Sequence, residues 1–188
     1  MRFQHIRHDE SHPFRTLLVQ NFVTGCTMTV NRALLDVALP VPDASPMHDW
    51  WFALCAAACG EVVCVPRPTV AYRRHGRNTV PVRGFWRTLN PFFTDWKDVW
   101  TSAQRTHGRA VQQTVALLAR LEATSAGQPA RVSEGRAFVA LHHAARLSRL
   151  RLAVALGLRS QSWPRTVALY LRIAAGPPGA DAGTRAAA

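Results

Sequence analysis

The pattern of apolar residues changes at about residue 90, and this change limits what each part of the chain can fold into. Before it, prolines and glycines separate short apolar runs, which is typical of mixed short strands and helices. After it, Ala, Leu and Arg recur at helical spacing. The sequence therefore predicts an α/β region over 1–90, an α-helical region over 91–175 and a disordered tail over 176–188.

Two helices are predicted in the first region. The segment 46–60, PMHDWWFALCAAACG, has Asp49 near its start and Gly60 at its end, and both residue types are common at those ends. The segment 31–38 predicts one or two helical turns, closed by the prolines that follow. Composition also predicts short strands at 27–30, 61–65 and 69–73.

Helices dominate the prediction for the second region. Over 108–122 the apolar side chains at i, i+4 and i+7, which predict the buried face of one helix, are Val111, Val115 and Leu118. The polar side chains on the opposite side are Arg109, Gln113 and Arg120. A linker is predicted over 124–133, and two further helices over 134–158 and 163–175.

The charge of the chain is strongly positive. It holds 23 Lys and Arg residues against 11 Asp and Glu, for a net charge of +12. An excess of this size indicates a polyanionic partner, which could be nucleic acid, an anionic membrane surface or a phosphorylated substrate. The sequence has neither a signal-peptide pattern nor an apolar run near the roughly 18 residues of a membrane span. A cytoplasmic protein is therefore predicted, with a peripheral position on the membrane as the other location.

Asp49 is the first candidate functional residue, and His48, Trp50 and Trp51 flank it. A carboxylate in the first turn of a helix is stabilised by the helix dipole. Flat aromatic rings beside a carboxylate are common in sugar-binding surfaces, because a ring can pack on a pyranose face. The residues alone leave a second interpretation open, in which Asp49 caps the helix and both tryptophans belong to the core.

A basic loop and a glycine-containing run carry further candidates. In the loop YRRHGRN, Arg73 and Arg74 could bind phosphate oxygens bidentately, and a solvated basic loop is the alternative. In the run NFVTGCTMTVN, Gly25 permits a close approach of a ligand to the backbone. A core strand with a bulge explains Gly25 equally well.

Taken together and in this order, these motifs resemble a known family. The runs QNFVTGCTMTVNR, ALPVP, MHDWW, GEVVCV and VAYRRHGRN are similar in order and spacing to the C-terminal part of glycosyltransferase family 2 enzymes, in the bacterial rhamnosyltransferase-like branch. The likeness is close over residues 14–80 and loose over the helical tail. It implies that 1–90 forms the acceptor-side half of a GT-A fold.

The resemblance implies an inverting transfer of a sugar, rhamnose in the nearest branch, from a nucleoside-diphosphate sugar to a glycan or lipid-linked acceptor. Asp49 matches the catalytic base that takes the proton from the attacking hydroxyl, here preceded by His48 where the family has Glu. The residues that would line the acceptor site are His48, Trp50, Trp51, Gly25, Cys26 and Thr27. Those that match the loop around the donor diphosphate are Arg73, Arg74, His75 and Asn78.

A divalent cation, Mg2+ or Mn2+, is also implied, and His75 matches a position that can ligate the metal in related folds. The family's donor-binding half, with its acidic D-x-D motif, has no counterpart in this chain, since neither Asp9 with Glu10 nor Asp95 with Asp98 forms that motif. The resemblance therefore implies a chain that starts partway through the expected fold and lacks the donor site.

Two non-enzymatic alternatives follow from the charge. A nucleic-acid-binding protein is disfavoured, because no helix-turn-helix, zinc-finger or RNP-type signature occurs. A peripheral membrane protein is favoured by the segment 163–175, where Trp163, Val167 and Tyr170 predict an apolar stripe. Arg165 and Arg172 fall opposite that stripe. The stripe could contact an anionic membrane or pack on the protein's own core.

Overall fold

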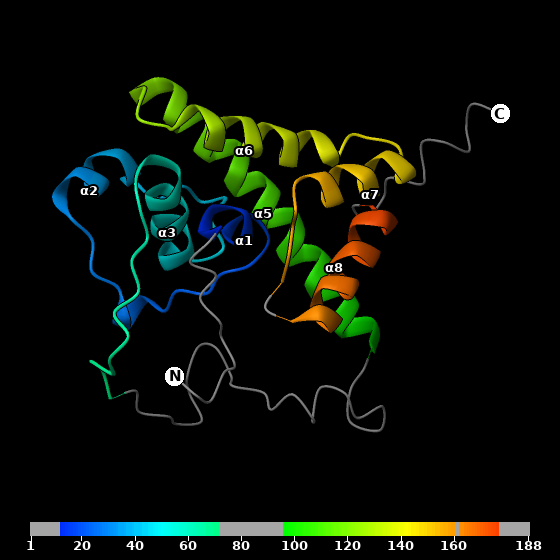
Figure 1. Cartoon of the computed structure of the whole chain (residues 1–188), viewed down its shortest axis with the longest axis horizontal. Coiled ribbons are helices and arrows are strands. Elements are labelled where there is room, and N and C mark those ends of the chain that lie inside the picture. The colour runs from blue at the N-terminus through cyan, green and yellow to red at the C-terminus, as the bar shows by residue number, and fades with distance from the viewer. Residues whose placement is uncertain (1–11, 72–95, 161, 177–188) are drawn as a thin grey trace.

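The computed structural model describes residues 12–71, 96–160 and 162–176, and every regular element within these ranges is a helix (Figure 1). The predicted α/β architecture, a partial GT-A-type fold followed by helices, is therefore wrong for the described residues. The segments 27–30 and 61–65 and the described part of 69–73 contain no strand. Residues 72 and 73 lie outside the described ranges.

The missing strands have a physical reason. A strand is stable only when its backbone N–H and C=O groups pair with a neighbouring strand. Over 61–65 the side chains still alternate, with Val62 and Cys64 half-buried and Val63 and Val65 exposed. The alternating burial of a strand is therefore present, but no ladder forms beside it within the part of the chain that the structure describes.

The first region folds into short helices. Their bounds are α1 Pro13–Val19, a 3-10 turn Gly25–Thr27, α2 Arg32–Ala38 and α3 His48–Cys59. The predicted helices at 31–38 and 46–60 are confirmed. The Asn31 side chain caps α2 by accepting a hydrogen bond of 2.9 Å from the Leu34 amide. The sequence did not predict α1, which buries Phe14, Leu17 and Leu18.

The longest helix within the described residues is α5, Trp96–Thr124. Its 29 residues span about 44 Å. Figure 1 shows it running from beside α8 to beside α2, while α6 returns along it. The helices that pack on it are α1, α2 and α6. The predicted linker over 124–133 is only a tight turn, because α6 begins at Pro129.

The remaining helices form the other end of the molecule. Their bounds are α6 Pro129–Leu141, α7 Arg146–Ala155 and α8 Trp163–Ala175. The predicted helix over 134–158 is therefore two helices, and the helix predicted over 163–175 is confirmed. No helix in the described ranges combines the length and the apolar character that a membrane crossing requires.

The buried face of α5 differs from the predicted one. Val115 is 49% exposed, whereas Gln113 is fully buried. The buried residues at helical spacing are Ala110, Thr114, Leu117 and Leu121. Because α1, α2 and α6 pack on α5 from more than one side, a single apolar stripe could not identify the covered surface.

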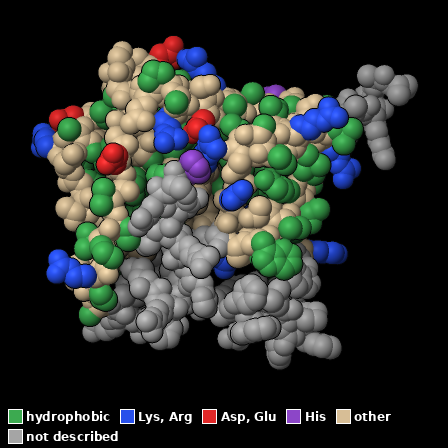
Figure 2. Space-filling view, viewed as in Figure 1, with side chains coloured by type: hydrophobic (Ala, Val, Ile, Leu, Met, Phe, Trp, Pro, Cys, Tyr) green, Lys and Arg blue, Asp and Glu red, His purple; other side chains and the backbone are tan. Residues whose placement is uncertain are grey.

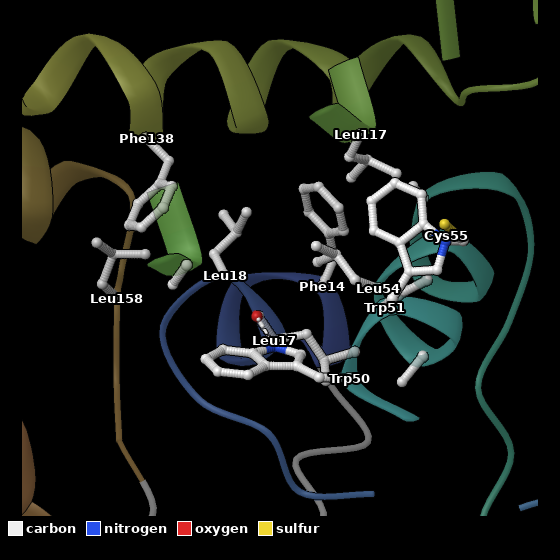
Figure 3. Packing of buried hydrophobic residues seen from close by; sticks show 14 of the residues in the cluster. Phe14, Leu17, Leu18, Trp50, Trp51, Leu54, Cys55, Leu117, Phe138 and Leu158 are labelled. Carbon is white, nitrogen blue, oxygen red and sulfur yellow. Dashed lines mark hydrogen bonds between the residues drawn. The ribbon is translucent and has the colours of Figure 1, made fainter. Parts of the chain in front are cut away.

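The core lies where α3 meets α1, α2 and α5. Trp50 and Trp51 are 1% and 0% exposed, and Figure 3 shows both indoles among apolar side chains from several helices. The Trp50 indole N–H donates to the Leu17 carbonyl at 2.6 Å, and the Trp51 indole N–H donates to the Ala38 carbonyl at 2.7 Å. Both polar atoms of this aromatic core are thereby satisfied.

A buried histidine pair joins α5 to the end of α6. The Nε2 atoms of His107 and His142 lie 2.9 Å apart, and His142 Nδ1 lies 3.1 Å from the Phe138 carbonyl. Because a carbonyl can only accept, His142 carries its proton on Nδ1 and accepts on Nε2 from His107. Burial, with smaller contributions from His142 and Arg172, lowers the pKa of His107 to about 3. Burial also lowers the pKa of His142.

This pair predicts that the fold loses stability in mild acid. Since the folded pKa of His107 lies below its ordinary value of 6.5, the unfolded chain binds more protons between about pH 6.5 and pH 3. The folding equilibrium constant should therefore fall by up to about tenfold per pH unit per buried histidine as the pH drops through this range. Urea titrations from pH 7.5 to pH 4.5 measure the slope.

The matched variants are His107→Asn and His143→Asn. His107→Asn should flatten the pH dependence, because it removes a buried titratable group. His143→Asn, which changes an exposed neighbour with only a small effect on the pKa of His142, should alter it far less. An equally steep pH dependence in His107→Asn would contradict the assignment.

Candidate functional site

The start of α3 and the loop after α1 meet at the carboxylate of Asp49. Its Oδ1 atom accepts from Asn21 Nδ2 at 3.0 Å and from the Trp50 amide at 2.7 Å. Its Oδ2 atom accepts from the Gly25 amide at 2.9 Å. Two segments that the sequence singled out separately, the run around Gly25 and the run around Asp49, therefore form one site.

The loop reaches Asp49 through local hydrogen bonds. Asn21 Oδ1 accepts from the Val23 amide at 2.9 Å, which turns the chain just after α1. A 3-10 turn over Gly25–Thr27 follows, and the Thr27 hydroxyl donates to the Thr24 carbonyl at 2.9 Å. This geometry directs the Gly25 N–H towards the α3 N-terminus.

Gly25 lies close to His48. A Cβ atom at position 25 would lie 2.9 Å from His48 Nε2 and 3.5 Å from Asp49 Oδ2. The backbone at Gly25 therefore packs directly against the imidazole, whose other side is exposed to solvent. Cys26 and Thr27, the next two residues, are also exposed. Together these residues form the accessible rim of the site.

Hydrogen-bond donors and a helix N-terminus surround the Asp49 side chain. Asp49 is 9% exposed, and it lies in the first turn of α3, where the helix dipole stabilises negative charge. A carboxylate offers about four acceptor positions, two on each oxygen. Asn21 and Trp50 donate to Oδ1, whereas within residues 12–71, 96–160 and 162–176 Oδ2 accepts a hydrogen bond only from Gly25. Among these residues, Oδ2 is therefore the oxygen with an acceptor position left for a further donor.

The two tryptophans do not line this site. Both rings are buried in the core and both indole N–H groups are bonded to main-chain carbonyls, so neither ring offers a face for stacking on a sugar. The predicted acceptor-binding role of Trp50 and Trp51 needs correction. The sequence interpretation that left them in the core is the one the packing supports.

The remaining predicted site residues lie elsewhere. The loop that was expected to hold a donor diphosphate, Arg73, Arg74, His75 and Asn78, lies outside the described residues, as does the predicted metal ligand. Across residues 12–71, 96–160 and 162–176, no group of three metal-ligating side chains occurs. His48 and Asp49 supply only two such groups, so the described residues do not provide a site for Mg2+ or Mn2+.

Asn21 is the site residue that the sequence did not predict. It lies within the same run, QNFVTGC, as Gly25. Its amide group donates to Asp49 through Nδ2 and accepts from the Val23 N–H through Oδ1, so two separate atoms fill the two roles. An Asn four residues before a loop glycine is a usable signal only once the carboxylate partner is known.

Comparison of the chain with protein-family models, with curated proteins and with solved structures finds no match. The functional assignment therefore depends on the residues of the site themselves.

The hydrogen bonds of Asp49 predict its contribution to stability. Asp49→Asn keeps the shape of the side chain but turns one oxygen into a donor, which must then face the Gly25 N–H or the donors of Asn21 and Trp50. Leaving buried donors unpaired should lower the free energy of unfolding by about 1–3 kcal/mol in a urea titration.

Asp36→Asn is the matched control. Asp36 pairs with Arg32 on the exposed surface of α2, at 3.2 Å, so its loss should cost less than about 1 kcal/mol. If Asp49→Asn were no more destabilising than Asp36→Asn, the hydrogen-bond arrangement of the site would be wrong.

Proposed function

We propose that this chain carries the acceptor side of an inverting glycosyltransferase and that Asp49 is its catalytic base. The acceptor is a glycan or a lipid-linked glycan, and the donor is a nucleoside-diphosphate sugar, with rhamnose as the sugar of the nearest branch. The observation that carries the proposal is the convergence of Gly25 and Asp49, 24 residues apart in sequence, at a hydrogen bond of 2.9 Å.

The proposed chemistry is a single displacement. Asp49 Oδ2 takes the proton of an acceptor hydroxyl while the oxygen of that hydroxyl attacks the anomeric carbon of the donor sugar. The nucleoside diphosphate leaves as the new bond forms. Asn21 and Gly25 hold the carboxylate in place by hydrogen bonds, so little reorganisation is needed when the proton moves. His48 lies at the exposed edge, where it could bind a second acceptor hydroxyl.

The donor side of the proposal rests on the resemblance alone. Arg73, Arg74, His75 and Asn78 would hold the diphosphate and stabilise the leaving group. The all-helical fold of the described residues holds no nucleotide-binding sheet. Transfer would therefore require a separate donor-binding half that supplies the D-x-D motif and the metal.

The proposed location is the cytoplasm, peripherally on the inner face of the cytoplasmic membrane, where a lipid-linked acceptor would be reached. A basic peripheral membrane protein without catalytic activity is the second candidate function. The observation that favours it is the set of large apolar side chains exposed on α8, which include Trp163 and Leu171. Nucleic acid is not proposed as a partner.

Asp49→Asn should abolish transfer. The assay uses the chain fused behind the donor-binding half of a family 2 enzyme, supplied with dTDP- and UDP-sugars, and measures nucleoside diphosphate release and glycosylated product. Loss of the proton acceptor should lower the rate by about 10²–10⁴-fold or more.

Asn21→Ala is the control that separates catalysis from structure. It removes one hydrogen bond to Asp49 and the acceptor for Val23, so it should destabilise the loop about as much as Asp49→Asn does, yet it keeps the carboxylate. Its transfer rate should stay within about tenfold of the original. Equal losses in both variants, with both folded by circular dichroism, would reduce Asp49 to a structural role.

A further inference from the structure

Five large apolar side chains are exposed on α7 and α8. On α8, Trp163 is 80% exposed, Leu171 is 59% exposed, and Val167 lies between them; on α7, Leu147 and Val154 are exposed as well. We call these five residues the α7–α8 face. Since α7 and α8 pack against each other, the five side chains belong to one structural unit.

The exposed stripe on α8 is a second apolar face of that helix. Trp163, Val167 and Leu171 follow i, i+4 and i+8, so they project from one side of it. The core side of α8 is formed by Leu169 and Ile173, which are buried. Burial of that side stabilises the fold, whereas much of the surface of the exposed stripe remains in contact with water.

The sequence predicted an apolar stripe of Trp163, Val167 and Tyr170 and left open whether it contacts a membrane or the protein's own core. Tyr170 is half-buried, and its hydroxyl donates to the Leu158 carbonyl at 3.0 Å, so this residue packs on the protein itself. Arg172, predicted opposite the stripe, is also half-buried. The exposed stripe on α8 is therefore formed by Trp163, Val167 and Leu171.

Positive charge borders the α7–α8 face. Figure 2 shows hydrophobic side chains gathered over α7 and α8, with Lys and Arg side chains around them. The exposed arginines of this part of the chain include Arg146, Arg151 and Arg159. Residues 129–175 hold eight arginines and a single acid, Glu134. Glu134 is already paired with Arg15 at 2.8 Å and with Arg131 at 3.1 Å.

We propose that the α7–α8 face docks on an anionic membrane surface. An exposed tryptophan with aliphatic neighbours and a border of arginines is the composition that partitions into the headgroup region, where the rings and aliphatic groups leave water and the guanidinium groups meet lipid phosphates. An apolar face that lies in the membrane interface is buried only about 5–10 Å into the boundary between headgroups and acyl chains, so no spanning helix is needed.

The charge pattern favours this occupant over two others. A second copy of the chain docked symmetrically on the same face would bring arginines against arginines, and like charges at an interface oppose association. Nucleic acid would pair with the arginines but would leave Leu147, Val154 and Leu171 without an apolar partner. An anionic bilayer satisfies both the apolar and the charged components.

Vesicle sedimentation tests the proposal. The full chain is mixed with vesicles of phosphatidylglycerol or of phosphatidylcholine, and the bound fraction is measured. Binding to phosphatidylglycerol should be about tenfold tighter or more, because each arginine near the surface gains from the anionic potential. Raising the salt from about 0.1 M towards about 1 M shortens the screening length from about 10 Å to about 3 Å and should weaken this binding.

The matched variants are W163S/L171S and V63S/V65S. Trp163 and Val63 are each 80% exposed, and Leu171 and Val65 are each 59% exposed, so the substituted positions are matched in their exposed fraction. W163S/L171S should weaken binding to phosphatidylglycerol vesicles by about tenfold or more, and V63S/V65S should not. Both residues of W163S/L171S are at the surface, so folding should be preserved in each variant.

Four outcomes would overturn the proposal. The first is equal recovery of the original chain in the supernatant with both lipids, and the second is equal binding of the two double variants. The third is a concentration-dependent dimer, seen by analytical ultracentrifugation without vesicles, that W163S/L171S abolishes. The fourth is tight DNA binding that the same variant weakens. The vesicle assay measures no sugar transfer. A negative vesicle result therefore does not test the catalytic role of Asp49, and a negative result for Asp49→Asn in the transfer assay does not test membrane binding.

Discussion

Two indole hydrogen bonds decide how the first helices of this protein are arranged. The indole N–H of Trp50 donates to the Leu17 carbonyl near the end of α1. The indole N–H of Trp51 donates to the Ala38 carbonyl at the end of α2. Because both donors are consecutive residues of α3, the positions of α1 and α2 relative to α3 are set together. Asp49 immediately precedes them, and the loop that leaves α1 must pass it. The candidate site is therefore a consequence of the aromatic core.

A second anchor joins this helical unit to α5. The guanidinium group of Arg120 donates to the Val37 and Leu39 carbonyls, each at 2.8 Å, and to the Pro40 carbonyl at 3.1 Å. It also lies 5.9 Å from the centre of the Trp51 ring. These contacts satisfy the carbonyls at the end of α2, which a helix otherwise leaves unpaired. The hydrophobic core accordingly runs without interruption from α1 to α8.

The sequence predicted elements best where a local signal was sufficient. Asp49 in the first turn of α3, Gly60 after its last residue and the prolines after α2 mark helix ends through local effects that depend on few neighbours. The strands failed because their stability depends on a partner strand, which the segment 61–65 cannot specify by itself. β-type composition was present, but the pairing was absent within the described residues.

Burial and side-chain roles were less predictable than the helices themselves. The side of α5 that is covered depends on three neighbouring helices, so the stripe containing Val115 misled the prediction. The sequence could not decide whether Trp50 and Trp51 are buried or exposed. Because α3 is buried around most of its circumference, its apolar residues show no period that singles out one side. The partnership between Asp49 and Gly25 required the tertiary structure, since nothing local links a loop glycine to a carboxylate 24 residues later.

An acceptor titration followed by nuclear magnetic resonance tests the central claim most directly. The isotope-labelled chain is titrated with short glycans, including rhamnosides, and backbone amide shifts are recorded for the original protein, Asp49→Asn and Asp36→Asn. The account predicts saturable shifts centred on Gly25, Cys26, Thr27 and His48, retained in Asp36→Asn and lost or strongly weakened in Asp49→Asn. Shifts that centre on another part of the molecule, or that are unchanged in Asp49→Asn, would contradict an acceptor site built on this carboxylate.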